Sequence, residues 1–352
     1  MNHRLKSFLK YTLMFALAGV LLWLSFRELK WKDFMAGLKA CRWSYVAFTM
    51  AVSIVAFYIR ALRWRELIIP IDQSVSRLAC FNAINIGYIV NIVLPRIGEF
   101  VRCGYITKHS ARGDDGKKLA TYDRVLGTMV ADRMWDLITM LLLIAVVMAV
   151  SVNRYGAFFM DKVIAPITSG LNMSLGTLML IVVAVFALAV WLIVHFKDRH
   201  PLSSKLYKPL VGVWHGVVSC FRMKTWWKFA IYSLLIWACY WMMSAGILWA
   251  VQGMDSCSLG ESMAGTIGQM QDMGLDDALF LMLVGGVSSL VPVPGGFGAF
   301  HYLVSLAMLT IYGIPVEVGV IFATLSHESQ IVTEILCGSL SYVWETVHPE
   351  KK

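Results

Sequence analysis

Two arginines and a glutamate interrupt an otherwise apolar stretch of this 352-residue chain. Arg96, Glu99 and Arg102 follow Leu94-Pro95, and Gly98 stands among them. A charge at membrane depth costs roughly 2.5–3.5 kcal/mol on insertion scales, so such a residue faces a cavity or a partner. A helix starting near Gly98 has an anion-favouring end, and arginine binds phosphate through two donors. The sequence predicts that Arg96, Glu99 and Arg102 bind a lipid phosphate. The alternative is that the arginines only extend to the interface.

A second charged group lies within a long apolar segment. Asp132 and Asp136 are four residues apart and share a helix face, while Arg133 points about 100° away. Two acids on one face of a membrane helix need a cationic partner, and Arg96 and Arg102 are candidates. The sequence predicts an internal ion pair for Asp136. A solvated first helical turn is the alternative reading.

A third group surrounds the run Pro-Val-Pro-Gly-Gly-Phe-Gly at residues 292–298. No lysine follows it, so it is not a phosphate-binding P-loop. It should open the helix and expose backbone groups. Its site residues are Pro294, Gly295, Gly296, Gly298 and the following His301. A histidine here titrates near neutral pH or is simply hydrogen-bonded.

A further polar face is formed by His327, Gln330 and Glu334. His327-Glu-Ser-Gln-Ile331 is close to the zinc-protease motif HExxH, but Ile331 removes the second ligand. A metalloprotease is therefore rejected, and His327 and Gln330 are assigned to contact with a polar headgroup. The sequence predicts no metal site and no cofactor.

The composition explains where these groups must lie. The chain is 58% hydrophobic and only 15% charged, whereas soluble domains carry about 25% charged residues. The net charge of +9 comes from basic residues in short loops beside apolar segments. That placement indicates membrane orientation and contact with anionic headgroups rather than nucleic acid.

The expected fold is an all-α polytopic membrane protein with about six full transmembrane helices. Each span needs about 20 apolar residues. The six spans cover residues 9–26, 43–62, 126–150, 175–196, 227–251 and 318–344. Two broken segments, 78–107 and 278–312, are interrupted by proline and glycine and should form re-entrant helix pairs.

The distribution of basic residues predicts the orientation. Arg4, Lys6 and Lys10 place the N-terminus in the cytoplasm by the positive-inside rule, and the C-terminus returns there. Residues 1–150 and 174–345 then form two halves of opposite orientation within a single membrane domain, 1–352. Such an inverted-topology repeat is typical of transporters. The basic loop 27–42 falls outside in this scheme, against the charge rule.

Three motifs also resemble those of a known family. They are Asn91-x-x-Leu-Pro-Arg-x-Gly-Glu-x-x-Arg102, Asp132-Arg133-x-x-Asp136 and Pro292-x-Pro-Gly-Gly-x-Gly298. Over nearly the whole chain they resemble the lysylphosphatidylglycerol synthase transmembrane-region family of flippase-like proteins. Many relatives have Glu where this chain has His301. The resemblance implies a protein of the bacterial cytoplasmic membrane that moves or handles phospholipids or isoprenoid-phosphate lipids. A soluble aminoacyltransferase domain is not expected.

The leading hypothesis is a flippase-like translocase for an anionic lipid, with the substrate passing through a central cavity. An integral-membrane transferase using a polyprenyl-phosphate donor, or a non-catalytic partner of an envelope-lipid pathway, are the alternatives. Expected partners are membrane lipids, chiefly anionic, and no nucleic acid. A homo-oligomer or a lipid-modifying enzyme partner is left open.

Overall fold

The computed structural model describes residues 3–27, 29–94, 96–114, 116–151, 225–255 and 261–348, with a few positions between 177 and 207. The regular elements in these residues are helices, apart from one isolated bridge between Arg112 and Lys118. The expected all-α polytopic membrane fold is confirmed. The chain forms two compact units, which we describe separately. The main unit contains Met1–Met129 and Trp227–Lys352, and the second unit contains Val130–Trp226.

Four helices in the described residues are long and apolar enough to cross a membrane. They are α3 (Trp43–Ile68), α6 (Tyr122–Val150), α11 (Trp226–Gln252) and the stretch Pro294–Tyr312 that contains α14. α1 (His3–Phe26) and α2 (Trp31–Ala40), which bend by 85°, would make a fifth. The expected span 175–196 lies outside the described residues.

The last expected span, 318–344, lies within α15 (Val316–Val347). Its 32 residues measure about 48 Å at 1.5 Å per residue, longer than the hydrocarbon core. α15 is nevertheless not among the four apolar helices, because His327, Glu328 and Glu334 occupy its middle. Ionisable groups in the middle of a membrane-spanning helix face other protein elements or water rather than lipid.

The first broken segment is a pair of short helices, α4 (Arg77–Val93) and α5 (Ile97–Lys108). At 17 and 12 residues they measure about 26 and 18 Å, so neither crosses a core of about 30 Å. Asp72, before α4, accepts hydrogen bonds from Ser110 and Ala111, after α5. The chain therefore enters and leaves this hairpin at the same end of the main unit.

The second broken segment consists of α13 (Leu275–Ser288), the 3₁₀ turn η3 (Pro294–Gly296) and α14 (Ala299–Tyr312). Each helix has 14 residues, about 21 Å. A Cβ atom at Gly285 would lie 2.5 Å from the Phe300 ring, so the helices lie side by side. Both broken segments thus form helical hairpins, and in the second the stretch Pro294–Tyr312 is also long and apolar enough to cross a membrane.

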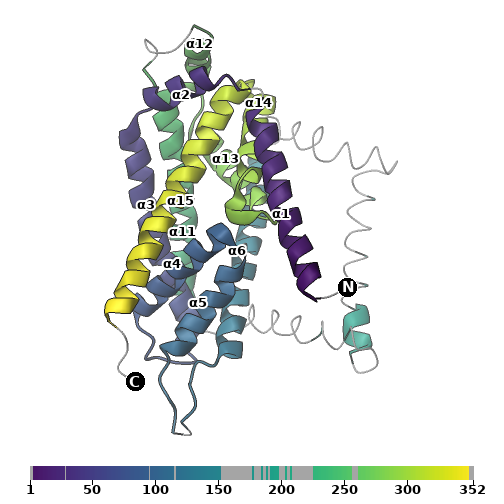
Figure 1. Ribbon diagram of the computed structural model, residues 1–352, viewed down its shortest axis with the longest axis vertical. Helices are drawn as coiled ribbons and strands as arrows, with labels where there is room; N and C mark the ends of the chain where they lie inside the picture. The colour runs from purple at the N-terminus through teal and green to yellow at the C-terminus, as the bar shows by residue number, and fades with distance from the viewer. Residues whose placement is uncertain are drawn as a thin grey trace. The chain divides into compact units, whose positions relative to one another are not determined.

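The long helices of the main unit run between two ends, and different short helices lie at each end. α2 and α12 (Glu261–Met270) lie at one end, and α5 and the C-terminal part of α15 lie at the other (Figure 1). At the first end, Arg42 N–H donates to Ala250, and Asp255 N–H donates to Ala40. The turn between α2 and α3 is therefore joined to the C-terminal end of α11 and the residues just after it.

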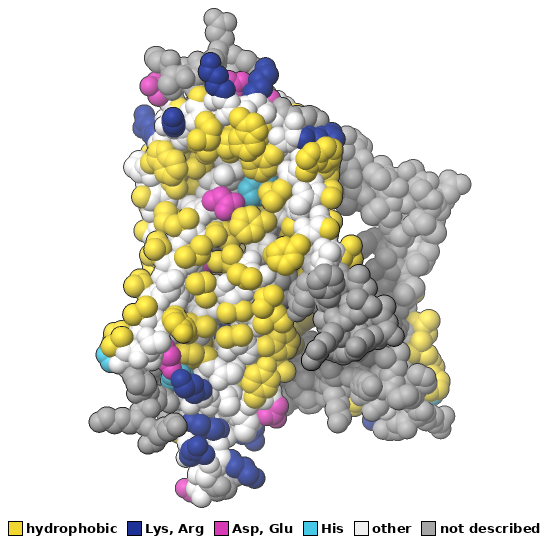
Figure 2. All heavy atoms as spheres, in the orientation of Figure 1, with side chains coloured by type: hydrophobic (Ala, Val, Ile, Leu, Met, Phe, Trp, Pro, Cys, Tyr) yellow, Lys and Arg dark blue, Asp and Glu magenta, His cyan; other side chains and the backbone are white. Residues whose placement is uncertain are grey.

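The surface between these ends is largely apolar. On the face drawn in Figure 2, most charged side chains gather at the two ends of the main unit. Apolar side chains cover most of the region between them, in which one patch of acidic and histidine side chains is also visible. Exposed apolar residues come from several helices, including Ile54, Val55, Leu234, Leu336 and Leu340. Extended apolar surface of this kind is what a lipid-facing wall requires.

Candidate functional site

The tip of the α4–α5 hairpin is held by a side-chain cap. The Oδ1 atom of Asn91 accepts a hydrogen bond from Gly98 N–H at 2.8 Å, which satisfies a free donor in the first turn of α5. Arg96 precedes this turn with φ 65°, a left-handed conformation uncommon for residues other than glycine. Its side chain is exposed. The tip therefore offers a guanidinium group beside a helix N-terminus.

The two helices of this hairpin approach closely at a pair of glycines. A Cβ atom at Gly98 would overlap the carbonyl oxygen of Gly87 and lie 2.7 Å from Asn91 Oδ1. Glycine at 98 is thus needed for the contact that also forms the Asn91 cap. The cap and the close contact explain why Asn91 and Gly98 are seven residues apart in the sequence motif.

Arg102 lies deeper in the same hairpin, with only 2% of its side chain exposed. Its Nη2 atom is 2.8 Å from Glu99 Oε2, and its Cζ atom lies 4.5 Å from the centroid of the Trp64 ring. Trp64 in turn donates from Nε1 to Thr128 at 3.1 Å. The sequence analysis identified Arg102 and Glu99 but missed Trp64, which is 38 positions earlier in the chain. Arg102 is therefore a buried, stacked cation, whereas Arg96 is the accessible one.

The tip of the second hairpin is built from glycines with positive φ. Gly295, Gly296 and Gly298 have φ values of 56°, 79° and 81°, which residues other than glycine rarely adopt. Pro294 opens the turn and is buried. A Cβ atom at Gly298 would lie 2.7 Å from the carbonyl oxygen of Ala18, so this tip packs directly on α1. The predicted opening of the helix at this motif is present in the structure.

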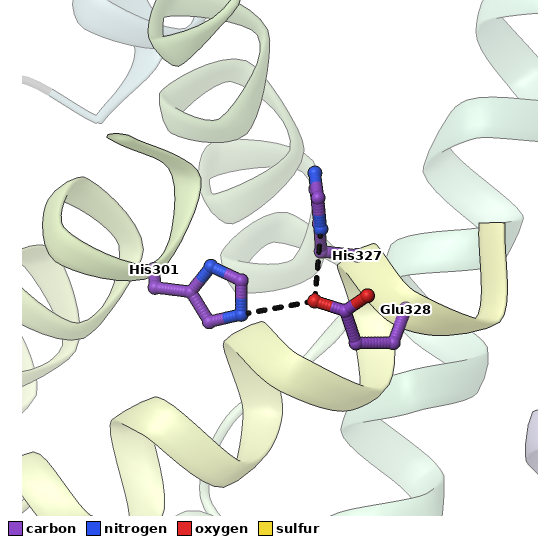
Figure 3. A group of neighbouring side chains, drawn as sticks. All are labelled: His301, His327 and Glu328. Carbon is purple, nitrogen blue, oxygen red and sulfur yellow. Dashed lines mark hydrogen bonds and ion pairs between the residues drawn. The ribbon is translucent and has the colours of Figure 1, made fainter. Parts of the chain in front are cut away.

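Three ionisable side chains meet behind this tip (Figure 3). His301 of α14 and His327 of α15 both point toward Glu328 of α15. Oε1 of Glu328 is 3.4 Å from His301 Nε2 and 3.2 Å from His327 Nδ1. The other nitrogen of His327, Nε2, is 2.8 Å from the carbonyl oxygen of Gly295. We call His301, His327 and Glu328 the His–His–Glu cluster.

The sequence analysis selected both histidines of this cluster but left out Glu328. The signal that could have found it is the adjacent pair His327-Glu328 in an apolar helix, which the search for HExxH dismissed. Adjacent helical residues point about 100° apart, so helical periodicity does not predict that both reach His301. The meeting depends on how α14 packs on α15, which are in contact along the main unit.

The two hairpin tips also meet each other. η3 packs against α4, and a Cβ atom at Gly295 would lie 3.5 Å from the carbonyl oxygen of Ile92. Ile92 lies in the last turn of α4, four residues before Arg96. The interrupted backbones of both halves of the chain are therefore brought to one place within the main unit.

A further polar group connects α3, α11 and α15. Arg60 is 6% exposed and donates from Nη1 to Tyr240 Oη at 2.7 Å. Glu334 interacts electrostatically with Arg60 and His327. The sequence analysis placed Glu334 on the face of α15 with His327 and Gln330, and Gln330 is half-buried there. Neither Arg60 nor its partner Tyr240 was among the residues predicted from the sequence.

The remaining predicted residues belong to the second unit. Asp132 is 1% exposed, and Arg133 Nη1 lies 3.9 Å from Asp136 Oδ2 on the same helix, α6. The expected pairing of these acids with Arg96 or Arg102 would join the two units and stays a prediction.

Comparison with known proteins gives one result that bears on this arrangement. A family model described as the lysylphosphatidylglycerol synthase TM region matches residues 11–338. Comparisons with curated proteins and with solved structures found no match. The family match covers both hairpins, their tips and the His–His–Glu cluster. The chain belongs to the lysylphosphatidylglycerol synthase transmembrane-region family.

Proposed function

We propose that this protein translocates an anionic phospholipid or an isoprenoid-phosphate lipid across the bacterial cytoplasmic membrane. The observation that carries the proposal is the meeting of two interrupted helical hairpins, where Gly295 of one tip lies against Ile92 of the other. Hydrocarbon offers no partners to non-helical backbone, so such tips occur where protein or a watery cavity supplies them. Paired broken helices at mid-membrane are the usual substrate sites of secondary transporters.

The chemistry of the first tip favours an anionic headgroup. Arg96 is exposed at the N-terminal end of α5, where the helix dipole and free N–H groups favour negative charge. A guanidinium group binds a phosphate through two parallel hydrogen bonds. Arg96 would receive the phosphate, while the buried pair of Arg102 and Glu99 on Trp64 keeps α5 in position.

The test uses purified protein in liposomes that contain trace headgroup-labelled lipids of different classes. An impermeant quencher removes label from the outer leaflet only, so loss beyond about half of the label reports movement between leaflets. We expect such loss for at least one anionic lipid and a marked reduction with Arg96→Ala. Arg77→Ala is the matched control, because Arg77 is an exposed arginine at the other end of the same hairpin.

Arg96→Gly separates the charge from the backbone. Glycine is favoured at φ 65°, so this variant keeps the tip conformation while removing the whole side chain with its guanidinium group. Transport should fall in Arg96→Gly as in Arg96→Ala and be kept in part by Arg96→Lys. Normal transport in the glycine variant would exclude Arg96 as the phosphate ligand. No movement of any lipid by folded wild-type protein would favour the transferase or partner functions instead.

A further inference from the structure

The His–His–Glu cluster has the composition and geometry of a metal site. Each of the three residues offers one ligand atom, and these atoms lie within 4.8 Å of one another. Two imidazoles and one carboxylate are the protein ligands of several zinc and iron centres. We propose that His301, His327 and Glu328 bind a divalent transition-metal ion of the zinc class, which ties the tip of the α13–α14 hairpin to α15.

The hydrogen bond of His327 fixes which of its nitrogens can bind the ion. The carbonyl oxygen of Gly295 only accepts, so Nε2 of His327 must carry a proton and donate to it at 2.8 Å. In the neutral ring the lone pair is then on Nδ1, which faces Glu328 Oε1 at 3.2 Å. Metal-binding histidines usually donate their other N–H to a carbonyl or carboxylate group in this way.

With the His327 proton on Nε2, the lone pair of its Nδ1 faces a lone pair of Glu328 Oε1. Oε1 of Glu328 faces a nitrogen of His327 and a nitrogen of His301, and Nδ1 of His301 is buried with no hydrogen-bond partner among the described residues. When both rings are neutral, Nε2–H of His301 can donate to Glu328 Oε1, but Nδ1 of His327 then faces the same oxygen with no proton between them. A divalent cation at the common point of approach would satisfy all three ligands together.

The distances agree with the size of such an ion. Ligands about 2.0–2.1 Å from a tetrahedral zinc ion are about 3.3–3.4 Å apart. The two separations to Glu328 Oε1 are 3.4 and 3.2 Å. The ligand nitrogens of the two imidazoles, at most 4.8 Å apart, need to approach by no more than about 1.5 Å to reach this separation.

The surroundings of the cluster suit a site that is closed on one side. His301 is 1% exposed, and its ring lies 5.7 Å from that of Phe26 on α1. The rings of Phe297 and Phe300 lie 5.0 and 5.4 Å from His327. Glu328 retains 37% exposure of its side chain, which gives an ion a route of entry and leaves room for a water molecule as fourth ligand.

The test is direct binding to detergent-purified full-length protein that has been treated with a chelator and dialysed. Co²⁺ serves as the spectroscopic probe, because tetrahedral Co²⁺ absorbs visible light, and Zn²⁺ is the competitor. We expect one Co²⁺ per chain, displaced by Zn²⁺. Glu328→Gln and His301→Ala should each weaken binding at least about tenfold, since even the outer partners of metal ligands contribute about 10–100-fold.

Two matched controls show whether the effect belongs to the cluster. His348→Ala removes an exposed histidine near the C-terminus, and Glu317→Gln removes an acid from the first turn of α15. Both should bind Co²⁺ like the wild type. Glu328→Gln is isosteric at a partly exposed position, so folded protein should be available for comparison.

The result that would overturn the proposal is an absence of saturable Co²⁺ uptake in the wild type. Equal binding by Glu328→Gln and the wild type would overturn it as well. The measurement uses no lipid transport, so the metal site and the transport function can succeed or fail independently.

Discussion

Gly98 has no side chain, and this absence allows α4 and α5 to pack closely together. We expect Gly98→Ala to destabilise the protein by about 1–3 kcal/mol, the usual cost of overpacking, because the new methyl group would overlap the Gly87 carbonyl oxygen. It should also displace the Asn91 cap. The measurement is the thermal unfolding midpoint of the purified protein.

A second glycine of α5 provides the control. A Cβ atom at Gly104 meets no atom within 4 Å. Gly104→Ala should therefore leave the midpoint unchanged or raise it, since alanine is favoured over glycine in a helix by about 0.5–1 kcal/mol. Equal destabilisation by both substitutions would contradict the close approach of the two helices.

Asp72 should give a measurable pH dependence of stability. Burial alone raises the pKa of Asp72, but hydrogen bonds from Ser110, Ser74 and Ala111 outweigh it and lower that pKa below its ordinary value. A depressed pKa in the folded state stabilises the protein above the unfolded pKa of about 3.9. This contribution is lost as the pH falls through the lower, folded-state pKa.

The expected outcome for Asp72→Asn is a loss of about 1–3 kcal/mol at pH 7, because the amide presents donors to groups that themselves donate. The difference from wild type should shrink when unfolding is measured below about pH 4. Asp114→Asn, an exposed acid in the loop after α5, is the control and should change little. A difference that stays constant down to pH 3 would rule out this role.

At this scale the sequence allowed candidate residues to be selected, but it did not predict which residues lie next to them. Arg96, Glu99, His301 and His327 were selected because ionisable groups are costly in an apolar chain. Trp64 and Glu328 were missed, since their roles depend on contacts made in three dimensions. The sequence also did not predict that Arg96 is exposed and Arg102 buried, because this difference depends on the left-handed backbone conformation at Arg96.

At the scale of helices, the C-terminal part of α15 is joined to α5 by one carboxylate. Glu345 accepts hydrogen bonds from Tyr105 at 2.8 Å and Lys108 at 2.6 Å, and lies 3.1 Å from His109 Nε2. Lys108 is 61% exposed, so its ion pair contributes little. The less exposed contacts with Tyr105 and His109 should contribute most.

We therefore expect Glu345→Gln to destabilise the protein by about 1–3 kcal/mol and Lys108→Ala by less than about 1 kcal/mol. The check is the unfolding midpoint of each variant at low and high salt. Only the Lys108 contribution should depend on salt, because exposed pairs are screened. If Lys108→Ala destabilised the protein more than Glu345→Gln, the surface ion pair rather than the less exposed contacts would join the helices.

The sequence predicted the two hairpins well because proline and glycine mark them directly. The expected segment 78–107 corresponds to α4 and α5, and 278–312 to α13, η3 and α14. The number of spans was harder to predict, because α15 carries polar side chains that lower its apolar character without shortening it. In a uniformly apolar span, both the length and the hydropathy of the helix identify it as membrane-spanning. In a helix that contributes side chains to a polar site, the length still does so but the hydropathy does not.

At the scale of the whole molecule, the inverted repeat stays a prediction. In the main unit, hydrogen bonds of Asp72 join the loops before α4 and after α5, and Glu345 reaches the same end. Arg42 joins the turn between α2 and α3 to residues 250–253 at the other end. The span that would complete the second half, 175–196, lies outside the described residues.

The side of the membrane on which each end lies can be tested with a reporter that is active only outside the cytoplasm. Residues 108–124 carry five basic side chains, whereas residues 252–277 carry five acids and no lysine or arginine. The positive-inside rule therefore predicts that the α5 end faces the cytoplasm. Inserted after Arg112, an exposed position in the loop following α5, the reporter should be inactive.

The same reporter inserted after Gln271, between α12 and α13, should be active. Both insertions leave every helix of the main unit intact, so a difference in activity reports location rather than folding. Because Glu345 contacts α5, a reporter attached after His348 must follow the Arg112 insertion. Activity at both Arg112 and His348 with none at Gln271 would reverse the orientation but keep the hairpins. Opposite results at Arg112 and His348 would contradict the shared end itself.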